Sequence, residues 1–406
     1  MRNWERAVGR AVGIGVGICV GAAAVGAAGL LAGGTALARR VVTPEGSTAE
    51  PVTIAQLTRD EDRVIAWLTG HHATLPGQYS LLFDEGRGHA RLGPVVQRTA
   101  AAVAREVMQV DRGRLAPGTR GRLTGWWYPD PESLGLASSR ITYPTELGDA
   151  EAWVLRPKRA KRGRWAVHVH GRGALPEETL RGVLPLARAG VTSLVISYRN
   201  DPGAPAGEFG RYGIGVAESR DVDAALAEVR RRGADRVTLV GWSMGGTAVL
   251  RSATTGPYAA LVDGIILDSP AVDWPALLRH QAAGVPVPRP FADVGIELLQ
   301  RGLVKAGEPG GIDFPSLSPE RVAAALPVPT LIHASRGDTF VPSAGAEALA
   351  AARPDLVQLR LQHDAEHVRL WNTDPVAWER VTEQFARALP RPGWRGELPT
   401  PPVRLD

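Results

Sequence analysis

The chain has 406 residues, more than one average domain, which leaves room for a main domain of about 250 residues with smaller attachments. Hydrophobic residues make up 44% of it and charged residues 22%, and its glycines and prolines are spread among periodic segments, so a disordered chain is excluded. The net charge of +5 is a small excess of basic over acidic residues, and no nucleic-acid recognition motif accompanies it, so we expect no nucleic-acid partner.

The first feature along the chain is an uncharged run from Ala11 to Ala38. About 20 apolar residues are enough to cross a bilayer as a helix, so residues 1–40 are predicted to form an N-terminal tail and a transmembrane helix. A cleaved signal peptide is the alternative, because Ala36-Leu37-Ala38 resembles a cleavage site. The run is longer than the core of such a signal, and the pair Arg39-Arg40 suits the flank of an anchor.

Basic residues flank this run on both sides, with a slight excess before it. Because positive charge tends to stay in the cytoplasm, the excess favours a single span of the cell membrane with the rest of the chain outside the cytoplasm. The lipid bilayer is thus an expected partner. Cys19, the only cysteine, lies within the run, so no disulfide can form within the chain.

Residues 41–135 mix short apolar runs, such as Tyr79 to Phe83, with turn signals, such as Leu75-Pro76-Gly77. We predict a small, mostly β region here. From residue 136 to 392, strand-like runs alternate with amphipathic helical stretches, which is typical of an α/β domain with a mostly parallel sheet covered by helices on both faces. Residues 393–406 are interpreted as a C-terminal tail.

Seven short apolar runs are predicted to be strands buried on both faces of this sheet. They are Ala152 to Leu155, Trp165 to His170, Thr192 to Tyr198, Val237 to Val240, Gly264 to Asp268, Thr330 to His333 and Leu356 to Leu361.

The segment Gly241-Trp242-Ser243-Met244-Gly245 matches the G-x-S-x-G pattern of a nucleophile elbow. A strand-like run precedes it and Thr247 to Leu250 opens a helix after it, so strand, sharp turn and helix follow in order. The glycines have a steric reason to be there, because the serine backbone of an elbow is strained and a neighbouring chain passes close by. An ordinary glycine-rich turn is the alternative; we predict Ser243 as a nucleophile.

A serine nucleophile needs a base, and the base needs an orienting acid, in the chain order Ser, Asp, His. Asp338 lies in a turn-like stretch just after the strand that ends near His333, where such an acid is expected. His367 lies in a loop before the helix signalled by Asp374-Pro375 and is the predicted base.

Two rival residues are weighed against these assignments. His363 competes with His367, but it adjoins the strand end and has less reach; a surface histidine is the alternative for either. Asp268 is the reserve acid, because it ends a predicted strand, although hydrogen bonding of the turn at Ser269-Pro270 suits it better.

The oxyanion of a tetrahedral intermediate needs fixed backbone amides. One candidate is the amide of Met244, directly after the serine. The other is the amide of Arg172 within His170-Gly171-Arg172-Gly173, which follows a predicted strand. The side chain of Arg172 is a possible contact for an anionic group of a substrate.

With these residues in view, the stretch from about Ile141 to Leu389 resembles the α/β-hydrolase superfamily, particularly the serine esterases and the catalytic domains of dipeptidyl-peptidase-like enzymes. The resemblance rests on the oxyanion segment, the elbow, Gly337-Asp338 and His367. It implies hydrolysis through an acyl-enzyme, with no metal and no organic cofactor. The roughly 100 residues before Ile141 are too few for the propeller of the oligopeptidases, and residues 271–326 form an insertion that we expect to be a cap over the pocket.

The leading expectation is therefore an esterase-like serine hydrolase acting on a small-molecule ester or amide. A peptidase or aminopeptidase with the same triad is the second expectation. A catalytically inactive hydrolase fold that serves as a membrane-bound scaffold is the third, because sequence alone does not assemble a triad.

Overall fold

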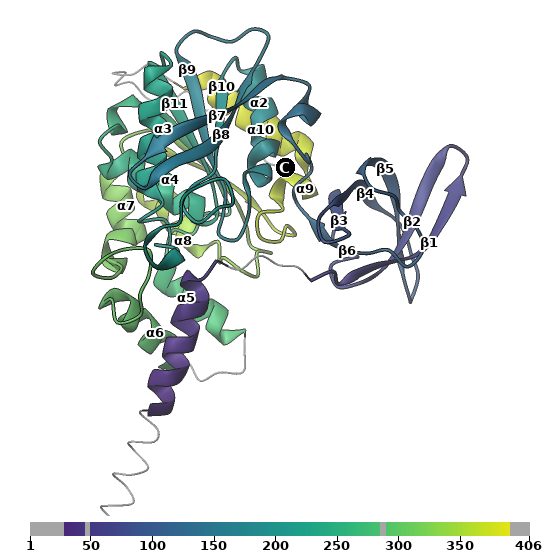
Figure 1. The fold of residues 1–406 in the computed structure, drawn as a ribbon, viewed down its shortest axis with the longest axis horizontal. Coiled ribbons are helices and arrows are strands. Elements are labelled where there is room, and N and C mark those ends of the chain that lie inside the picture. Colours follow the sequence, from purple (N-terminus) through teal and green to yellow (C-terminus); the bar gives the residue numbers. More distant parts are fainter. Residues whose placement is uncertain (1–27, 45–48, 285–289, 390–406) are drawn as a thin grey trace, which may run out of the picture.

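A computed structural model describes residues 28–44, 49–284 and 290–389 (Figure 1). A helix over residues 28–42 leads into a small barrel, and the barrel is followed by a larger domain in which helices cover a central sheet.

The barrel is closed and purely antiparallel, in the strand order β1-β2-β5-β4-β3-β6. Its strands are β1 (Val52–Asp60), β2 (Arg63–Gly70), β3 (Tyr79–Phe83), β4 (Gly88–Arg98), β5 (Val103–Arg112) and β6 (Arg120–Thr124). Side chains alternate between the two faces of a strand, so Val52 and Ile54 of β1 both point into the barrel core. A mostly β region was predicted here; closure into a barrel was not.

The central sheet has eight strands in the order β14-β13-β12-β11-β9-β10-β8-β7. They are β7 (Ala137–Thr145), β8 (Gly148–Arg156), β9 (Arg164–Val169), β10 (Thr192–Ile196), β11 (Arg236–Trp242), β12 (Val262–Asp268), β13 (Thr330–Ser335) and β14 (Val357–Gln362). Strand β8 runs antiparallel to its neighbours β7 and β10. Strands β9 to β14 are all parallel to one another. All seven predicted strands are present, with different ends.

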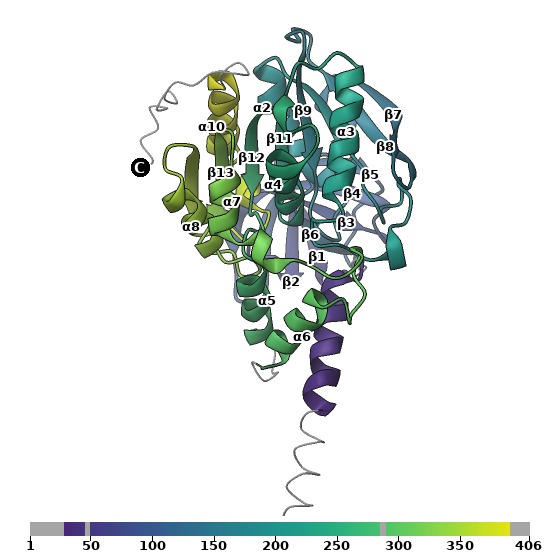
Figure 2. The ribbon, with the colours of Figure 1, turned by 90° about the vertical axis from the view of Figure 1, so that its left-hand side faces the viewer.

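Helices cover both faces of this sheet (Figures 1 and 2). The α-helices are α2 (Val183–Arg188), α3 (Ser219–Arg231), α4 (Met244–Thr255), α5 (Trp274–Ala283), α6 (Pro290–Gln300), α7 (Pro319–Ala325), α8 (Ala344–Ala352), α9 (Leu370–Thr373) and α10 (Pro375–Ala388). The 3-10 helices are η1 (Pro131–Leu134), η2 (Pro176–Gly182), η3 (Glu208–Gly210), η4 (Ala259–Leu261) and η5 (Phe314–Leu317).

The sheet separates two hydrophobic cores. Adjacent residues of one strand enter different cores: Leu239 packs with α3, α4 and α8, whereas Val240 packs with α2 and α10. Because side chains on a strand alternate between faces, an uninterrupted apolar strand such as β11 fills both cores. The sheet is therefore fixed between its helix layers, and its strand ends become rigid positions for functional side chains.

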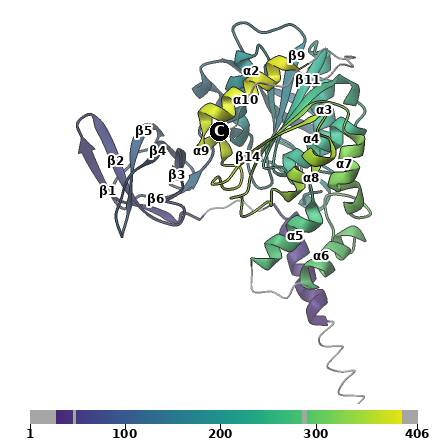
Figure 3. The same ribbon diagram turned by 180° about the vertical axis from the view of Figure 1, so that it is seen from behind.

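The helix over residues 28–42 packs against α6 (Figures 2 and 3). The contact needs glycine, since a Cβ atom on Gly34 would lie 2.5 Å from Val294 Cγ1. Ala38, Val41 and Val42 are buried, and the amide of Tyr212 donates a 2.7 Å hydrogen bond to the carbonyl of Val42. The carboxyl end of this helix is thus bound to the larger domain.

The predicted membrane anchor is not supported by this arrangement. Among the described residues, no helix is both long enough and apolar enough to cross a bilayer. Much of the predicted span, together with Cys19, lies within residues 1–27, outside the described residues. The remainder, residues 28–38, belongs to the helix that packs on α6, where small residues permit close contact with protein.

The barrel contacts the larger domain through Asn372, which is fully buried in α9. Its side-chain amide donates to the carbonyls of Gln78, at 3.0 Å, and Gly125, at 3.1 Å. Its side-chain oxygen, Oδ1, accepts a 2.6 Å hydrogen bond from Arg181 Nη1. One side chain thus joins both flanks of the barrel to the helical layer.

Candidate active site

Ser243 lies at the sharp turn between β11 and α4, with φ 49° and ψ −117°. These angles are unfavourable for a residue with a Cβ atom, and such strain is typical of functional turns. The turn is held because the Ser243 amide donates to the carbonyl of Asp268 at 3.0 Å. A Cβ atom on Gly241 would lie 2.6 Å from the Gly245 carbonyl oxygen, and one on Gly245 would lie 2.4 Å from that of Val169, so both positions require glycine.

The structure brings Ser243, His367 and Asp338 together. Ser243 Oγ lies 2.9 Å from His367 Nε2, and His367 Nδ1 lies 2.7 Å from Asp338 Oδ2. A carboxylate only accepts hydrogen bonds, so Nδ1 carries the proton and Nε2 is left to accept one from the serine. The imidazole therefore presents a basic nitrogen to the hydroxyl.

The carboxylate of Asp338 is fixed by its own loop after β13. Its Oδ1 accepts hydrogen bonds from the amides of Phe340, at 2.9 Å, and Val341, at 2.8 Å, which leaves Oδ2 for His367. The ring of Phe340 lies 5.0 Å from the imidazole, centroid to centroid, and covers one side of it. The orientation of His367 is thus set by one hydrogen bond and one ring contact.

His363 and Asp268, the alternatives to His367 and Asp338, do not belong to the hydrogen-bonded triad. His363 is exposed at the end of β14. Asp268 is buried, and its carboxylate accepts from Trp378 Nε1 at 2.8 Å and from the Ser269 hydroxyl at 3.1 Å. Burial raises the pKa of Asp268 to about 6, against the opposing effect of nearby Arg181 and of the hydrogen bonds.

Asp268 supports the site through its neighbour. The Ser269 hydroxyl that donates to Asp268 also accepts a 3.0 Å hydrogen bond from the amide of Val368. Val368 follows His367 directly, so the strand end of β12 positions the loop that carries the imidazole. The turn-bonding role expected for Asp268 thus agrees with its hydrogen bonds, which extend to this loop.

The segment after β9 passes beside the serine. A Cβ atom on Gly171 would lie 3.0 Å from Ser243 Cβ, so the backbone here comes as close as glycine allows. The amide of Gly173 donates to the Tyr212 hydroxyl at 3.1 Å. Met244 opens α4, whose first turn carries partial positive charge. Arg172 and Met244 therefore lie on the two segments that flank the serine.

The side chain of Arg172 points toward protein. Its Nη1 lies 3.4 Å from the carbonyl oxygens of Arg40 and Val41, at the carboxyl end of the helix over residues 28–42. A cation is favourable at that end of a helix because the carbonyl groups there carry partial negative charge. This contact does not support the predicted contact with an anionic substrate group.

A buried pair under this segment was not predicted. His170 Nε2 lies 2.8 Å from Asp201 Oδ2, and the imidazole stacks on Tyr198 with ring centroids 4.2 Å apart. Burial disfavours the charged ring, but the Asp201 carboxylate outweighs it and raises the pKa of His170. The pair fixes the start of the Gly171 segment. In the sequence, the feature that could have indicated this pair was a histidine at the end of an apolar strand.

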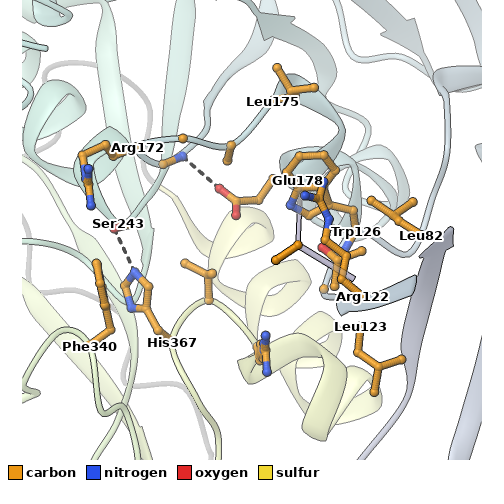
Figure 4. Close-up of a pocket in the computed structure, with 18 of the residues that line it drawn as sticks. Leu82, Arg122, Leu123, Trp126, Arg172, Leu175, Glu178, Ser243, Phe340 and His367 are labelled. Atoms are coloured by element: carbon orange, nitrogen blue, oxygen red, sulfur yellow. Dashed lines mark hydrogen bonds between the residues drawn. The ribbon is translucent and has the colours of Figure 1, made fainter. Parts of the chain in front are cut away.

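The serine opens into a cavity of about 920 Å³ that lies between the barrel and the larger domain (Figure 4). The barrel and its loops contribute His72, Leu82, Arg122 and Trp126 to the wall. Burial, with nearby Arg369 and His71, lowers the pKa of His72 to about 4. Nothing in the sequence indicated that the barrel would form part of the site.

Arg105 holds the barrel loop that carries two of the lining residues. Its guanidinium, buried within the barrel, donates to the carbonyls of Ala73, at 3.1 Å, and Gly77, at 2.7 Å. His71 and His72 come directly before Ala73 in the chain, and both line the cavity. In the described part of the chain, no group of His, Cys, Asp or Glu side chains is placed so that it could hold a metal ion.

Two family profiles match the sequence. Residues 53–124, which include most of the barrel, match a domain of unknown function (DUF8805). Residues 166–401, more than half of the chain, match the alpha/beta hydrolase family. None of the curated protein sequences compared with the chain matches it.

Several solved structures resemble this one. The esterase Pf2001 of Pyrococcus furiosus is 17% identical with a TM-score of 0.50, over 64% of this chain and 94% of the esterase. The esterase domain of a Rhodothermus marinus protein is 21% identical with a TM-score of 0.43, over 62% and 99% of the two chains. A puromycin-hydrolyzing peptidase of Mycobacterium tuberculosis is 17% identical with a TM-score of 0.48, over 82% and 47%. The likeness to Pf2001 shows the fold alone. The profile match over residues 166–401 shows that the chain belongs to the alpha/beta hydrolase family.

Proposed function

We propose that the chain is a serine hydrolase that cleaves a carboxylic ester or amide through an acyl-enzyme intermediate. Ser243 is the nucleophile, His367 the general base and Asp338 the residue that orients the imidazole. The observation that carries the proposal is the unbroken pair of hydrogen bonds from the Asp338 carboxylate, through His367, to the Ser243 hydroxyl.

The first half of the reaction forms the acyl-enzyme. Ser243 Oγ attacks the carbonyl carbon of the substrate while His367 Nε2 accepts the hydroxyl proton. Asp338 stabilises the imidazolium that results. His367 then returns the proton to the leaving oxygen or nitrogen as the bond to the carbonyl carbon breaks. In the second half a water molecule attacks the ester on Ser243 while His367 accepts its proton. His367 then returns the proton to Ser243 Oγ as the bond between Oγ and the acyl carbon breaks and the carboxylic acid leaves.

The negative charge of each tetrahedral intermediate falls on the former carbonyl oxygen. In the proposal the backbone amides of Met244 and Arg172 donate to it. Support comes from their places on the two segments that flank Ser243, including the first turn of α4. Fixed donors of this kind act without reorganisation in a site shielded from water and usually contribute about 100-fold or more to the rate.

Turnover of p-nitrophenyl acyl esters and aminoacyl p-nitroanilides by the full chain tests the proposal. We expect hydrolysis that falls by roughly 10⁴-fold or more in kcat in Ser243→Ala and His367→Ala. His363→Ala is the matched control, because this exposed histidine lies outside the hydrogen-bonded triad, and it should keep the original rate. Undiminished turnover in Ser243→Ala would refute the proposal, and a folded protein that hydrolyses neither class favours the inactive scaffold.

The location of the enzyme is a separate part of the proposal. The uncharged run from Ala11 to Ala38 would hold the chain in the cell membrane, with the hydrolase domain outside the cytoplasm; only the sequence supports this. The full chain should then stay in the membrane fraction during an alkaline carbonate wash and leave it in detergent. Release by carbonate would contradict an anchor.

A further inference from the structure

Glu178 places a buried carboxylate beside the nucleophile. It lies in η2, shortly after the segment that passes Ser243, and is only 4% exposed. Its Oε2 accepts a 2.8 Å hydrogen bond from the amide of Gly171, and the residue lines the cavity into which Ser243 opens. Figure 4 shows the side chain reaching from η2 toward the interior of this cavity.

No cationic side chain among residues 28–44, 49–284 and 290–389 forms an ion pair with this carboxylate. Buried Arg181 donates its Nε to the backbone carbonyl of Glu178, and its Nη1 donates to the Val368 carbonyl and to Asn372 Oδ1. Arg181 and His170 act on this carboxylate through their charge, but neither donates a hydrogen bond to it. A carboxylate can accept more than the single bond from Gly171, so it keeps acceptor positions for a group in the cavity.

The arginines that line the same cavity are directed elsewhere. Arg172 contacts the carbonyl groups at the end of the helix over residues 28–42, and the Arg369 guanidinium lies 5.7 Å from the ring centroid of Tyr79. Arg122 belongs to the barrel side of the cavity, where the carboxylate of Glu50 acts on its charge. The acceptor positions of Glu178 that Gly171 does not occupy are thus left for a group that enters the cavity.

The position of the carboxylate limits what that group can be. The Cβ position of Gly171 would lie 3.0 Å from Ser243 Cβ and 3.3 Å from Glu178 Oε2, so one glycine separates the nucleophile from the acid. A cation that binds Glu178 while Ser243 attacks a carbonyl must lie within a few bonds of that carbonyl. An ammonium group on the carbon next to it meets this requirement.

We propose that Glu178 binds a protonated α-amine, so that the substrates are aminoacyl esters or amides with a free amino group. This inference rests on the proposed function and specifies its substrate class. An ammonium with N–H donors can bind the carboxylate directly, while Gly171 keeps Oε2 in place. Trp126 and Tyr212 in the cavity wall are available to face the aliphatic or aromatic part of the substrate.

The test compares two esters that differ only in this amine: alanine benzyl ester and propanoic acid benzyl ester, each assayed with the full chain at neutral pH. The unsubstituted protein should have at least a tenfold higher kcat/KM for the alanine ester. Glu178→Gln keeps an oxygen that can accept from Gly171 but removes the charge. It should lower kcat/KM for the alanine ester by roughly 10- to 100-fold. It should change kcat/KM for the propanoate ester by no more than about threefold.

Glu177→Gln is the matched control. Glu177 is the adjacent carboxylate, it does not line the cavity, and its removal should change neither rate by more than about twofold. N-acetylalanine benzyl ester, whose nitrogen is neutral, should behave as the propanoate ester does.

Two results would overturn the inference: equal rates for the two esters in the unsubstituted protein, or an equal loss for both in Glu178→Gln. Either result leaves the proposed function in place, provided that turnover depends on Ser243. Turnover that does not depend on Ser243 overturns the proposed function itself, and with it the inference.

Discussion

His367 Nε2 lies 2.9 Å from Ser243 Oγ, although 124 positions separate the two residues in the chain. Their contact follows from the sheet. Ser243 follows β11, His367 follows β14 and Asp338 follows β13, and parallel strands bring their carboxyl ends to one edge. Because the strands are held between two packed cores, the three side chains meet without any long flexible segment having to close.

The role of the acid is tested by Asp338→Asn, which preserves size but lets the side chain donate as well as accept. The imidazole would then be held in the wrong tautomer, and kcat should fall by on the order of 10⁴-fold. Asp268→Asn is the control, because the hydrogen bonds of that carboxylate go to Trp378 and Ser269, and its kcat should stay within about tenfold. The opposite ranking of the two variants would identify Asp268 as the catalytic acid.

Asp268 also makes a pH-dependent contribution to stability. Its pKa in the folded protein is about 6, above the ordinary aspartate value of 3.8, so the folded chain holds this proton more tightly than the unfolded chain. The free energy of unfolding therefore falls as pH rises from about 4 to about 6, by on the order of 3 kcal/mol for this group.

Denaturant unfolding of the unsubstituted protein and of Asp268→Asn at pH 4 and at pH 7 measures this contribution. The asparagine does not titrate, so the unsubstituted protein should lose stability relative to the variant at the higher pH. A difference between the two proteins that is the same at both pH values would argue against a raised pKa.

The strain at Ser243 predicts that a glycine at this position is more stable than an alanine. Both substitutions remove the hydroxyl, but only glycine adopts φ 49° and ψ −117° without a steric penalty. The free energy of unfolding of Ser243→Gly should exceed that of Ser243→Ala by about 1 kcal/mol, with both proteins inactive. Equal stabilities from denaturant titrations would mean that the turn is relaxed.

Asn372→Ala tests the attachment of the barrel. The change removes the donor that the carbonyls of Gln78 and Gly125 share, and one of the acceptors of the Arg181 guanidinium. It should lower the free energy of unfolding by roughly 2 to 4 kcal/mol and raise KM, because the barrel forms a wall of the cavity. Gln109→Ala, which removes an amide on the exposed face of β5, should leave both unchanged. An unaltered KM in a destabilised Asn372→Ala would separate the barrel from substrate binding.

The packing of the helix over residues 28–42 is tested by two valine substitutions. A Cβ atom on Gly34 meets Val294 at 2.5 Å, whereas one on Gly29 meets nothing within 4 Å. Gly34→Val should therefore separate the helix from α6 and increase proteolytic cleavage near residue 44 at least several-fold. Gly29→Val should leave the cleavage rate as it was. Equal protection in both variants would show that this helix does not pack as described.

The sequence predicted the parts of the fold that depend on local pattern. The seven strands were found because each carries a short apolar or alternating run; β9, β10, β12 and β13 are buried at every position, whereas β8 and β14 are only partly buried. Ser243 stood out because an elbow imposes glycines at fixed spacing. Asp338 and His367 were located as candidates because each follows a recognisable strand. Their geometry relative to the serine depends on strand order, which only the folded sheet determines.

What the sequence did not reveal depends on contacts between distant segments. Closure of the barrel comes from the pairing of β1 with β6, which no short pattern encodes. The His170–Asp201 pair and the Glu178–Gly171 hydrogen bond join residues whose roles emerge only when loops meet. An uncharged run rich in small residues suits a membrane helix and a protein-packed helix equally well, and within it Gly33 and Gly34 pack on α6.

The most direct test of the central claim is covalent labelling with a fluorophosphonate, followed by mass spectrometry of the modified peptide. We expect one adduct per chain, on Ser243, that is absent from Ser243→Ala and forms much more slowly in His367→Ala. A folded protein that takes up no label, or that is labelled equally after Ser243→Ala, would contradict this claim.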